Sequence, residues 1–348
     1  MLKIGKMNDG SDVYISEKSP NRHISVLGIS GSGKTVRLRE LIRNVIANGE
    51  TALIFDINGM DYRDCTDKVN VISAKKDGLN ARLLDTGLNT SAEDEISYVT
   101  CIVRVLCRAF RLGSKQEEAL RNAILYAMRH AEAYTSDLEA IEAGLQEQAT
   151  AASDSVESRL WEFLNINIAR RNQLQMRTGY ANVISFEGIS KVLQSVWVEV
   201  LLALLWNNLR RNAMLVKTLW IFIDEFQNLS LKKDSVLPEM LQESRKYGVN
   251  IVLATQSVTG YEKDIMAAID QTAVHLYFQQ SLTDVKKVAA SIDVRKKTFW
   301  ETKLKSLRVG ESVAVGNFDV RGRNISNPII VKSAYAEGCK KIRDGIEK

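Results

Sequence analysis

The sequence is poor in the residues that break secondary structure and in those that most often bind metals. It has three prolines, three histidines and four cysteines in 348 residues. So few prolines indicate helices and strands joined by few extended linkers. The cysteines lack metal-ligand spacing, and the histidines are scattered along the chain. A structural zinc site and a disulfide framework are therefore not expected, and the cysteine usage indicates an intracellular, cytoplasmic protein.

Long hydrophobic runs are also missing. The first ten residues, MLKIGKMNDG, have no apolar core of the kind that a signal peptide needs. The strongest apolar run, residues 196–206, contains Glu199 and is too short to span a bilayer, so it predicts a buried helix. We therefore expect no membrane anchor.

Charge of one sign is in excess in two places: the C-terminal segment is basic, and residues 131–157 are acidic by comparison. The net charge is +5, but residues 286–348 carry fifteen Lys or Arg against seven Asp or Glu. A basic C-terminal segment fits contact with a nucleic acid, although a solvated charged face is the commoner reading. The composition, 45% hydrophobic and 26% charged, is that of a globular protein long enough for one large α/β domain with an insertion.

A glycine-rich loop is the most specific motif in the chain. Residues 28–35 read GISGSGKT and match G-x-x-x-x-G-K-[ST], with an apolar strand before them and a helix after them. Such glycines let consecutive backbone N–H groups turn toward phosphate oxygens, and the start of the helix adds the positive end of its dipole. Lys34 is expected at the β- and γ-phosphates, and the Thr35 hydroxyl on Mg²⁺. The residues predicted to contact ATP are Gly28, Ser30, Gly31, Ser32, Gly33, Lys34, Thr35 and Val36.

Two adjacent carboxylates follow a later apolar strand. The segment LWIFI at 219–223 runs directly into Asp224 and Glu225. Paired with the glycine-rich loop, Asp224 is expected to hold Mg²⁺ together with Thr35, and Glu225 to polarise the attacking water. Acidic residues at strand ends are common, so this pair indicates a nucleotide site only in combination with the glycine-rich loop. The combination predicts an enzyme that hydrolyses ATP.

Further polar residues are candidates for contact with the γ-phosphate. Gln256 ends the apolar strand VLATQ, where its amide could sense that phosphate; a glutamine satisfied by backbone groups is the alternative. Arg245 precedes the strand and could reach a neighbouring subunit's site as an arginine finger, or could interact with the C-terminus of its own helix. Lys246 has the same two possibilities, and Arg321 and Arg323 are second-choice finger residues.

The order of the elements indicates a parallel sheet. A strand at 23–28, a helix at 34–47 and a strand at 51–58 form a β–α–β unit. The small, polar segment 150–158 is expected to be a loop. We divide the chain into an N-terminal hairpin or lid, the first part of an α/β core, a mainly helical insertion, and the second part of the core with a C-terminal tail, at residues 1–20, 21–84, 85–179 and 180–348.

Four segments together resemble the HerA/FtsK superfamily of hexameric DNA-pumping ATPases, with HerA and the type IV secretion coupling ATPases looking most similar. They are GISGSGKT (28–35), FDINGMDY (55–62), WIFIDEFQNL (220–229) and ESRKYGVNIVLATQS (243–257). The resemblance implies a RecA-like P-loop NTPase core with a mostly parallel central sheet and a helical insertion. Under this resemblance the Walker A residues are Lys34 and Thr35, the Walker B residues Asp224 and Glu225, the sensor Gln256 and the proposed finger Arg245.

The sequence departs from the family pattern in two places. Met60 followed by Asp61 stands where relatives often carry an acidic residue directly after the glycine. HerA proteins have an N-terminal β-barrel that docks partner nucleases, whereas only 27 residues precede Gly28 here. We therefore expect that barrel to be absent or reduced to a hairpin.

The function expected from motifs and resemblance is that of a ring-forming ATPase, expected to be a hexamer, that couples ATP hydrolysis with Mg²⁺ to translocation of double-stranded DNA. The alternative is a HerA-like ring ATPase that acts mainly as a scaffold or switch for a nuclease-type effector in a defence or mobile-element system. An acidic insertion and a missing docking barrel would fit partner contacts of that kind.

Overall fold

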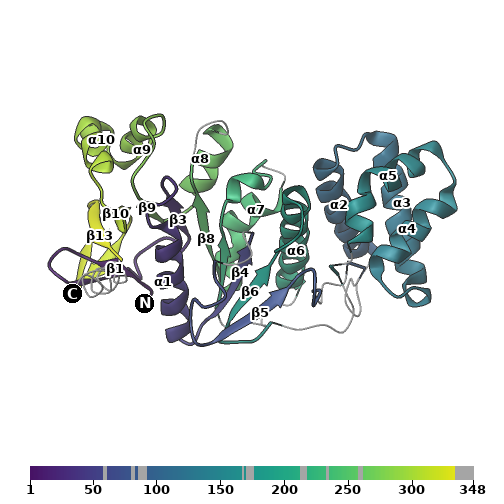
Figure 1. Cartoon of the computed structure of the whole chain (residues 1–348), viewed down its shortest axis with the longest axis horizontal. Helices are drawn as coiled ribbons and strands as arrows, with labels where there is room; N and C mark the ends of the chain where they lie inside the picture. The colour runs from purple at the N-terminus through teal and green to yellow at the C-terminus, as the bar shows by residue number, and fades with distance from the viewer. Residues whose placement is uncertain are drawn as a thin grey trace, which may run out of the picture.

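The computed structural model describes residues 1–57, 61–79, 83–84, 92–166, 168–169, 176–211, 218–232, 235–257 and 262–333. This part of the molecule is elongated, with a helical bundle at one end of a central sheet and antiparallel strands with two short helices at the other (Figure 1). The expected α/β class is confirmed. Met60, in one of the resembling segments, and the expected tail from residue 334 onward lie outside the described residues.

Seven parallel strands form the part of the sheet that carries the sequence motifs. Their spatial order is β9-β3-β8-β7-β4-β6-β5. Within them, successive residues face opposite sides: Ala52 and Ile54 of β4 join one hydrophobic cluster, and Leu53 and Phe55 join the other. Both faces are therefore buried, which explains the continuous apolar runs in the sequence. The strands are β3 (Ile24–Leu27), β4 (Thr51–Asp56), β5 (Val69–Ser73), β6 (Ala181–Ser185), β7 (Leu219–Ile223), β8 (Val249–Thr255) and β9 (Val274–Tyr277).

An antiparallel half continues the same sheet beyond β9, in the order β10-β13-β1-β2-β11-β12. The N-terminal hairpin thus forms as β1 and β2, but it is built into the sheet between β13 and β11. Terminal strands far apart in sequence therefore lie side by side. These strands are β1 (Lys3–Lys6), β2 (Asp12–Ile15), β10 (Glu311–Val315), β11 (Phe318–Val320), β12 (Arg323–Ile325) and β13 (Ile329–Lys332).

Helices cover both faces of the parallel strands. α1 packs on one face through Leu38, Leu41 and Val45, which belong to the same cluster as Val26 of β3. α6 lies on the other face, where Trp197 is fully buried. By length and composition, residues 191–210 of α6 could cross a membrane, but 56% of that stretch is buried inside the protein. The helices outside the insertion are α1 (Lys34–Ala47), α6 (Lys191–Arg211), α7 (Val236–Glu243), α8 (Glu262–Asp270), α9 (Val285–Ile292) and α10 (Lys297–Lys305).

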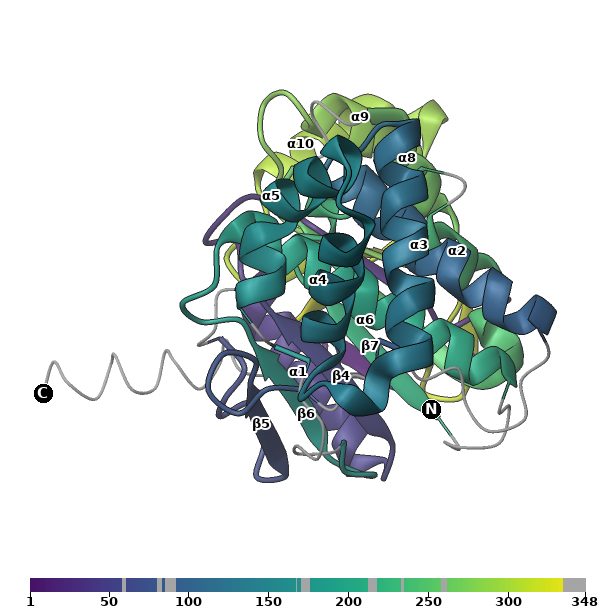
Figure 2. The same ribbon diagram turned by 90° about the vertical axis from the view of Figure 1, so that its right-hand side faces the viewer.

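The helices of the expected insertion form a bundle, facing the viewer in Figure 2, whose hydrophobic core is continuous with that around α6: α2 (Ala92–Ala109), α3 (Ser114–His130), α4 (Asp137–Gln148) and α5 (Ala151–Asn165). The expectation of a loop at 150–158 is wrong, because α5 begins there. Thr150 and Ser153 cap the helix reciprocally, with the backbone N–H of each donating to the hydroxyl of the other at 3.1 Å. Val156 and Leu160 then bury its apolar face in the bundle.

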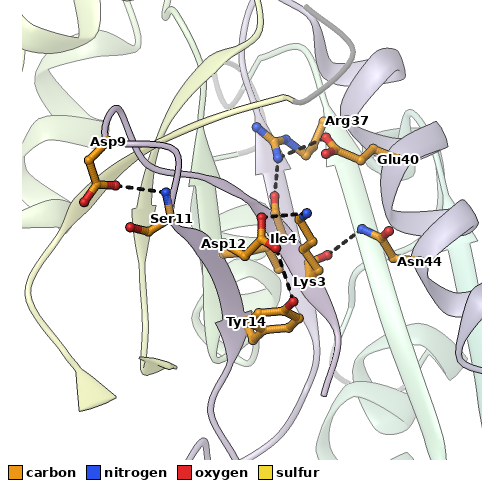
Figure 3. A network of polar contacts seen from close by, with 9 residues as sticks. All are labelled: Lys3, Ile4, Asp9, Ser11, Asp12, Tyr14, Arg37, Glu40 and Asn44. Carbon is orange, nitrogen blue, oxygen red and sulfur yellow. Dashed lines mark hydrogen bonds and ion pairs between the residues drawn. The ribbon is translucent and has the colours of Figure 1, made fainter. Parts of the chain in front are cut away.

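A buried polar network ties the N-terminal strand to α1 (Figure 3). The Arg37 guanidinium is fully buried; it donates to the Ile4 carbonyl and pairs with Glu40 at 3.2 Å. The Asn44 amide donates to the Lys3 carbonyl at 2.9 Å. Removing one partner of a buried ion pair usually costs several kcal/mol, about 3–5. The N-terminal strand is thus fastened to the helix that follows the glycine-rich loop.

A buried histidine makes folding stability pH-dependent. His23 is fully buried and accepts the Ile251 N–H at Nδ1, 3.0 Å away. Burial lowers the pKa of His23 from 6.5 to about 4. Protonation at Nδ1 would also break the bond to Ile251. The folded state therefore holds His23 neutral while the unfolded chain takes up its proton, so stability is lost as the pH falls from about 6.5 toward 4.

We expect this residue to contribute about 3 kcal/mol across that window. In His23→Asn, an amide oxygen can accept the same N–H without titrating, so the free energy of unfolding should change less between pH 7 and pH 5. Denaturant midpoints at each pH measure the effect, with His130→Asn on the exposed end of α3 as the matched control. Equal pH slopes in the wild-type and His23→Asn proteins would contradict this account.

Candidate nucleotide-binding site

The glycine-rich loop connects β3 to α1 at the carboxyl edge of the parallel strands (Figure 1). Gly31 and Gly33 have φ angles of 76° and 105°, which side-chain-bearing residues rarely adopt. A Cβ at Gly33 would lie 2.7 Å from the Gly310 nitrogen, and Gly310 N–H donates to the Ser32 carbonyl at 3.0 Å. The segment before β10 therefore packs directly against the loop and leaves room only for glycine.

Lys34 reaches back across the loop. Its Nζ donates to the carbonyls of Gly28 at 2.7 Å and Ile29 at 3.0 Å. Burial lowers the pKa of Lys34, and the Asp224 and Glu225 carboxylates oppose that effect. The structure thus brings the predicted lysine and the two predicted acids close enough to interact electrostatically. A buried cation next to two acids at the start of a helix suits a polyanionic phosphate chain with its counter-ion.

Asp224 follows β7 and is held at both carboxylate oxygens. Oδ1 accepts the Glu225 N–H at 3.0 Å, and Oδ2 accepts the Tyr62 hydroxyl at 2.9 Å. Burial raises the pKa of Asp224, while the hydrogen bond from Tyr62 lowers it. Burial also raises the pKa of Tyr62 well above its usual value, so its hydroxyl keeps its proton and acts as the donor.

Glu225 stands in an uncommon backbone conformation, with φ 52° and ψ 41°. Left-handed geometry in a non-glycine residue is often found at functional sites. Its Oε1 accepts the Gln256 amide, and its Oε2 accepts the Gln227 amide at 2.5 Å. Two glutamines thus orient the carboxylate, and the predicted sensor Gln256 is joined directly to the predicted base.

Arg245 does not join this group. It lies in the short turn before β8, where its guanidinium donates to the Pro20 carbonyl. β8 spans seven residues and ends beside the glycine-rich loop, so Arg245 sits about 20 Å away at roughly 3.3 Å per residue. Lys246 in the same turn pairs with Glu243 at the end of α7, and Arg321 pairs with Asp9 in the antiparallel half of the sheet. None of these cations completes the site of its own chain.

The residues present fit ATP with Mg²⁺. Thr35 and Val36 occupy the first turn of α1, directly after Lys34, and the Ser32 hydroxyl donates to the Ile29 carbonyl at 2.7 Å. Among the described residues, no three His, Cys, Asp or Glu side chains gather as in an all-protein metal site. Mg²⁺ is usually held by one or two protein oxygens together with substrate phosphates, so a site formed by the two predicted residues, Thr35 and Asp224, would need no further protein ligand.

The sequence did not single out Tyr62, Gln227 or the contact of Gly310 with the loop. Tyr62 stands inside FDINGMDY and Gln227 inside WIFIDEFQNL, so both lay within the resembling segments. Their partners are fixed by the fold, because Tyr62 is 162 residues from Asp224 along the chain. An aromatic residue next to an acid in a polar loop was the available signal.

Comparison with known proteins agrees with this geometry. A family described as "Helicase HerA, central domain" matches residues 2–205, more than half of the chain, and a "Type IV secretion-system coupling protein DNA-binding domain" matches residues 184–273. The DNA double-strand break repair helicase HerA of Saccharolobus solfataricus is 23% identical over an alignment that covers 97% of this chain and 69% of the relative.

Two solved structures share the fold. VirB4 of Thermoanaerobacter pseudethanolicus superposes with a TM-score of 0.75 at 15% identity, covering 97% of both chains. The plasmid coupling protein TrwB in complex with ADP and Mg²⁺ superposes with a TM-score of 0.60 at 16% identity, covering 89% of this chain and 84% of TrwB. The likeness confirms the P-loop ATPase fold over nearly the whole chain.

Substituting the tightest glycine tests the loop. In Gly33→Ala the added methyl group meets Gly310, so we expect the loop to shift and the affinity for a fluorescent ATP analogue to fall at least about tenfold. Gly49→Ala is the matched control, because Gly49 has φ 73° and open space around it. That control should lose about 1 kcal/mol of stability and keep its affinity. Unchanged binding by Gly33→Ala would remove this loop from nucleotide recognition.

Proposed function

The chain belongs to the family of the HerA helicase central domain, and on that premise we propose that it is a ring-forming ATPase that couples hydrolysis of ATP to translocation of double-stranded DNA. The observation that carries this proposal is the orientation of Glu225 by Gln256 and Gln227, one residue after Asp224 and close to Lys34. A carboxylate held in this way suits a residue that activates water as well as a site that binds nucleotide.

Each residue of the site has one role in the proposed reaction. Lys34 and the loop N–H groups bind the β- and γ-phosphates, with Ser30, Ser32 and Val36 shaping the cradle. Thr35 and Asp224 would hold Mg²⁺, which when bound would supply positive charge to the phosphate oxygens. Glu225 accepts a proton from the attacking water, and Gln256 links that carboxylate to the γ-phosphate. Hydrolysis then changes the bonding of Gln256 at the end of β8.

A ring would complete the site from outside the subunit. Arg245 lies at the edge of the sheet away from its own loop, exposed apart from its bond to Pro20. We propose that it enters the site of the neighbouring subunit as an arginine finger, in an assembly of six copies. The domain division at residues 20, 84 and 179 is part of the same proposal, with the insertion as an appendage of the ATPase core.

Duplex DNA is the proposed substrate of the motor. The S. solfataricus relative is named a DNA repair helicase, and the second matching family is named a DNA-binding domain. The C-terminal excess of Lys and Arg suits phosphate contacts, which read no sequence and weaken steeply with salt. We place the protein in the cytoplasm, since Cys65, Cys101 and Cys107 are all free thiols. Neither name favours the alternative of a scaffold for an effector.

The proposed base is tested by Glu225→Gln. The amide keeps the size of the side chain but cannot accept a proton, so we expect ATP to stay bound while turnover falls by at least about a hundredfold. Binding of a fluorescent ATP analogue and release of phosphate measure the two effects. Lys34→Ala is the contrasting variant and should lose binding itself. Normal turnover in Glu225→Gln would exclude the proposed role of Glu225.

The motor itself is tested by measuring ATPase activity with and without duplex DNA, alongside native mass with and without ATP. We expect stimulation by DNA that fades as salt rises, and a hexamer in the presence of nucleotide. Mixing Arg245→Ala subunits with Glu225→Gln subunits should restore part of the activity, because some interfaces then pair an intact base with an intact finger. Full ATPase activity in a monomer without DNA would contradict the proposal.

A further inference from the structure

A short segment between β4 and β5, residues 61–65, lies between the helix of the glycine-rich loop and the strand that carries Asp224. We call it the bridging segment. It belongs to none of the named helices or strands. Its position is instead set by contacts with α1, with Asp224 after β7 and with Glu187 after β6.

On one side, α1 holds the backbone of the bridging segment. Arg39 donates to the Asp61 carbonyl at 3.1 Å and to the Asp64 carboxylate at 2.7 Å. Arg43 donates to the Cys65 carbonyl at 2.7 Å. Arg39 and Arg43 lie one turn apart on α1, so the two bonds fix the segment along that helix. Movement of α1 therefore carries the bridging segment with it.

On the other side, the segment sends Tyr62 to Asp224. The side chain of Tyr62 is only 1% exposed, and its hydroxyl donates to Asp224 Oδ2 at 2.9 Å. Arg63 pairs with Glu187, just after β6. The segment thus reaches the carboxyl ends of two further strands. The phenol is rigid and buried, so it has no room to adopt another rotamer away from the carboxylate.

Two donors from different directions define the plane of the Asp224 carboxylate. Glu225 N–H occupies Oδ1, and the Tyr62 hydroxyl occupies Oδ2. Each carboxylate oxygen can accept more than one hydrogen bond, so both retain capacity for a metal or its water shell. Groups that hydrogen-bond a metal-binding carboxylate fix its direction, and losing them typically weakens metal binding tenfold to a hundredfold.

We propose that Tyr62 is a positioning residue for Mg²⁺, and that the bridging segment links the position of α1 to the direction of the Asp224 carboxylate. The inference rests on the proposed function, since it takes Asp224 as the Mg²⁺-binding acid. The glycine-rich loop leads directly into α1, so closure of the loop on phosphates shifts Arg39 and Arg43. Tyr62 then turns that shift into alignment of the carboxylate, and Mg²⁺ is held best when the phosphates are in place.

Mg²⁺-dependent binding of fluorescent ADP to Tyr62→Phe tests this inference without any need for turnover. The variant keeps the ring and removes only the hydroxyl. We expect the Mg²⁺ concentration for half-maximal binding to rise about tenfold, with ADP affinity in EDTA unchanged. Tyr98→Phe is the matched control: this buried tyrosine donates to the Leu83 carbonyl at 2.6 Å in the helical insertion. It should lose similar stability and keep its Mg²⁺ response.

Arg39→Gln is a second test, because it changes the contact between α1 and the bridging segment without altering Tyr62 or Asp224. It removes the guanidinium that contacts Asp61 and Asp64 and leaves only the Arg43 bond between α1 and the bridging segment, so the same Mg²⁺ curve should shift in the same direction by a smaller factor. An unshifted Mg²⁺ curve in Tyr62→Phe, or an equal shift in Tyr98→Phe, would overturn the role of Tyr62. Asp224→Ala distinguishes the two proposals. If Asp224→Ala loses the Mg²⁺ response while Tyr62→Phe keeps it unchanged, only this inference is wrong. If the wild-type protein shows no Mg²⁺-dependent binding of fluorescent ADP, the proposed function itself is wrong.

Discussion

The parallel register of β3, β8 and β7 is the constraint on which the site depends. Leu27 pairs with Thr255, and Leu253 pairs with Ile223, so the three strands end within about two residues of one another at the same edge. Whatever follows each strand must then meet in space. The glycine-rich loop follows the first strand, Gln256 the second and Asp224 the third. Side chains alternate between the two faces of a strand, so slipping the register by one residue would move every side chain to the opposite face.

Charged groups that are partly withdrawn from water hold the site together. Lys34 interacts electrostatically with Asp224 and Glu225, and burial shifts the pKa of Lys34 downward and that of Asp224 upward. The charge of Lys34 lowers the pKa of Asp224, whereas the neighbouring Glu225 carboxylate raises it. Hydrogen bonds from neighbouring elements then direct the carboxylates. This arrangement suits a phosphate chain and its cation.

The first strand of the described residues and the residue after the last strand are tied to the same helix as the site. Arg37 and Asn44 of α1 hold the N-terminal strand, while Ser333 beyond β13 donates to Glu40 of α1 at 2.8 Å. Arg39 and Arg43, on the same helix, hold the bridging segment. α1 is thus the common support of the loop, the terminal strands and the Asp224 carboxylate.

The sequence alone determined what depends on neighbouring residues. The glycine-rich loop, the acidic pair and the apolar strands were readable because each is a local pattern of spacing and period. The bounds of α1 were predicted as they are observed, at 34–47. The segment 150–158 was misjudged, since its small polar residues conceal the capping pair of Thr150 and Ser153 and its apolar face becomes evident only in the bundle.

The tertiary structure decided what depends on contacts between distant parts of the chain. The N-terminal hairpin became an interior pair of the large sheet because β13, more than 300 residues later, pairs with β1. Arg245 was placed away from its own loop by the length and direction of β8. Tyr62 found Asp224 across 162 residues. No local pattern encodes such pairings, because they arise when separate hydrophobic faces pack together and leave each polar group with the partner that happens to be in reach.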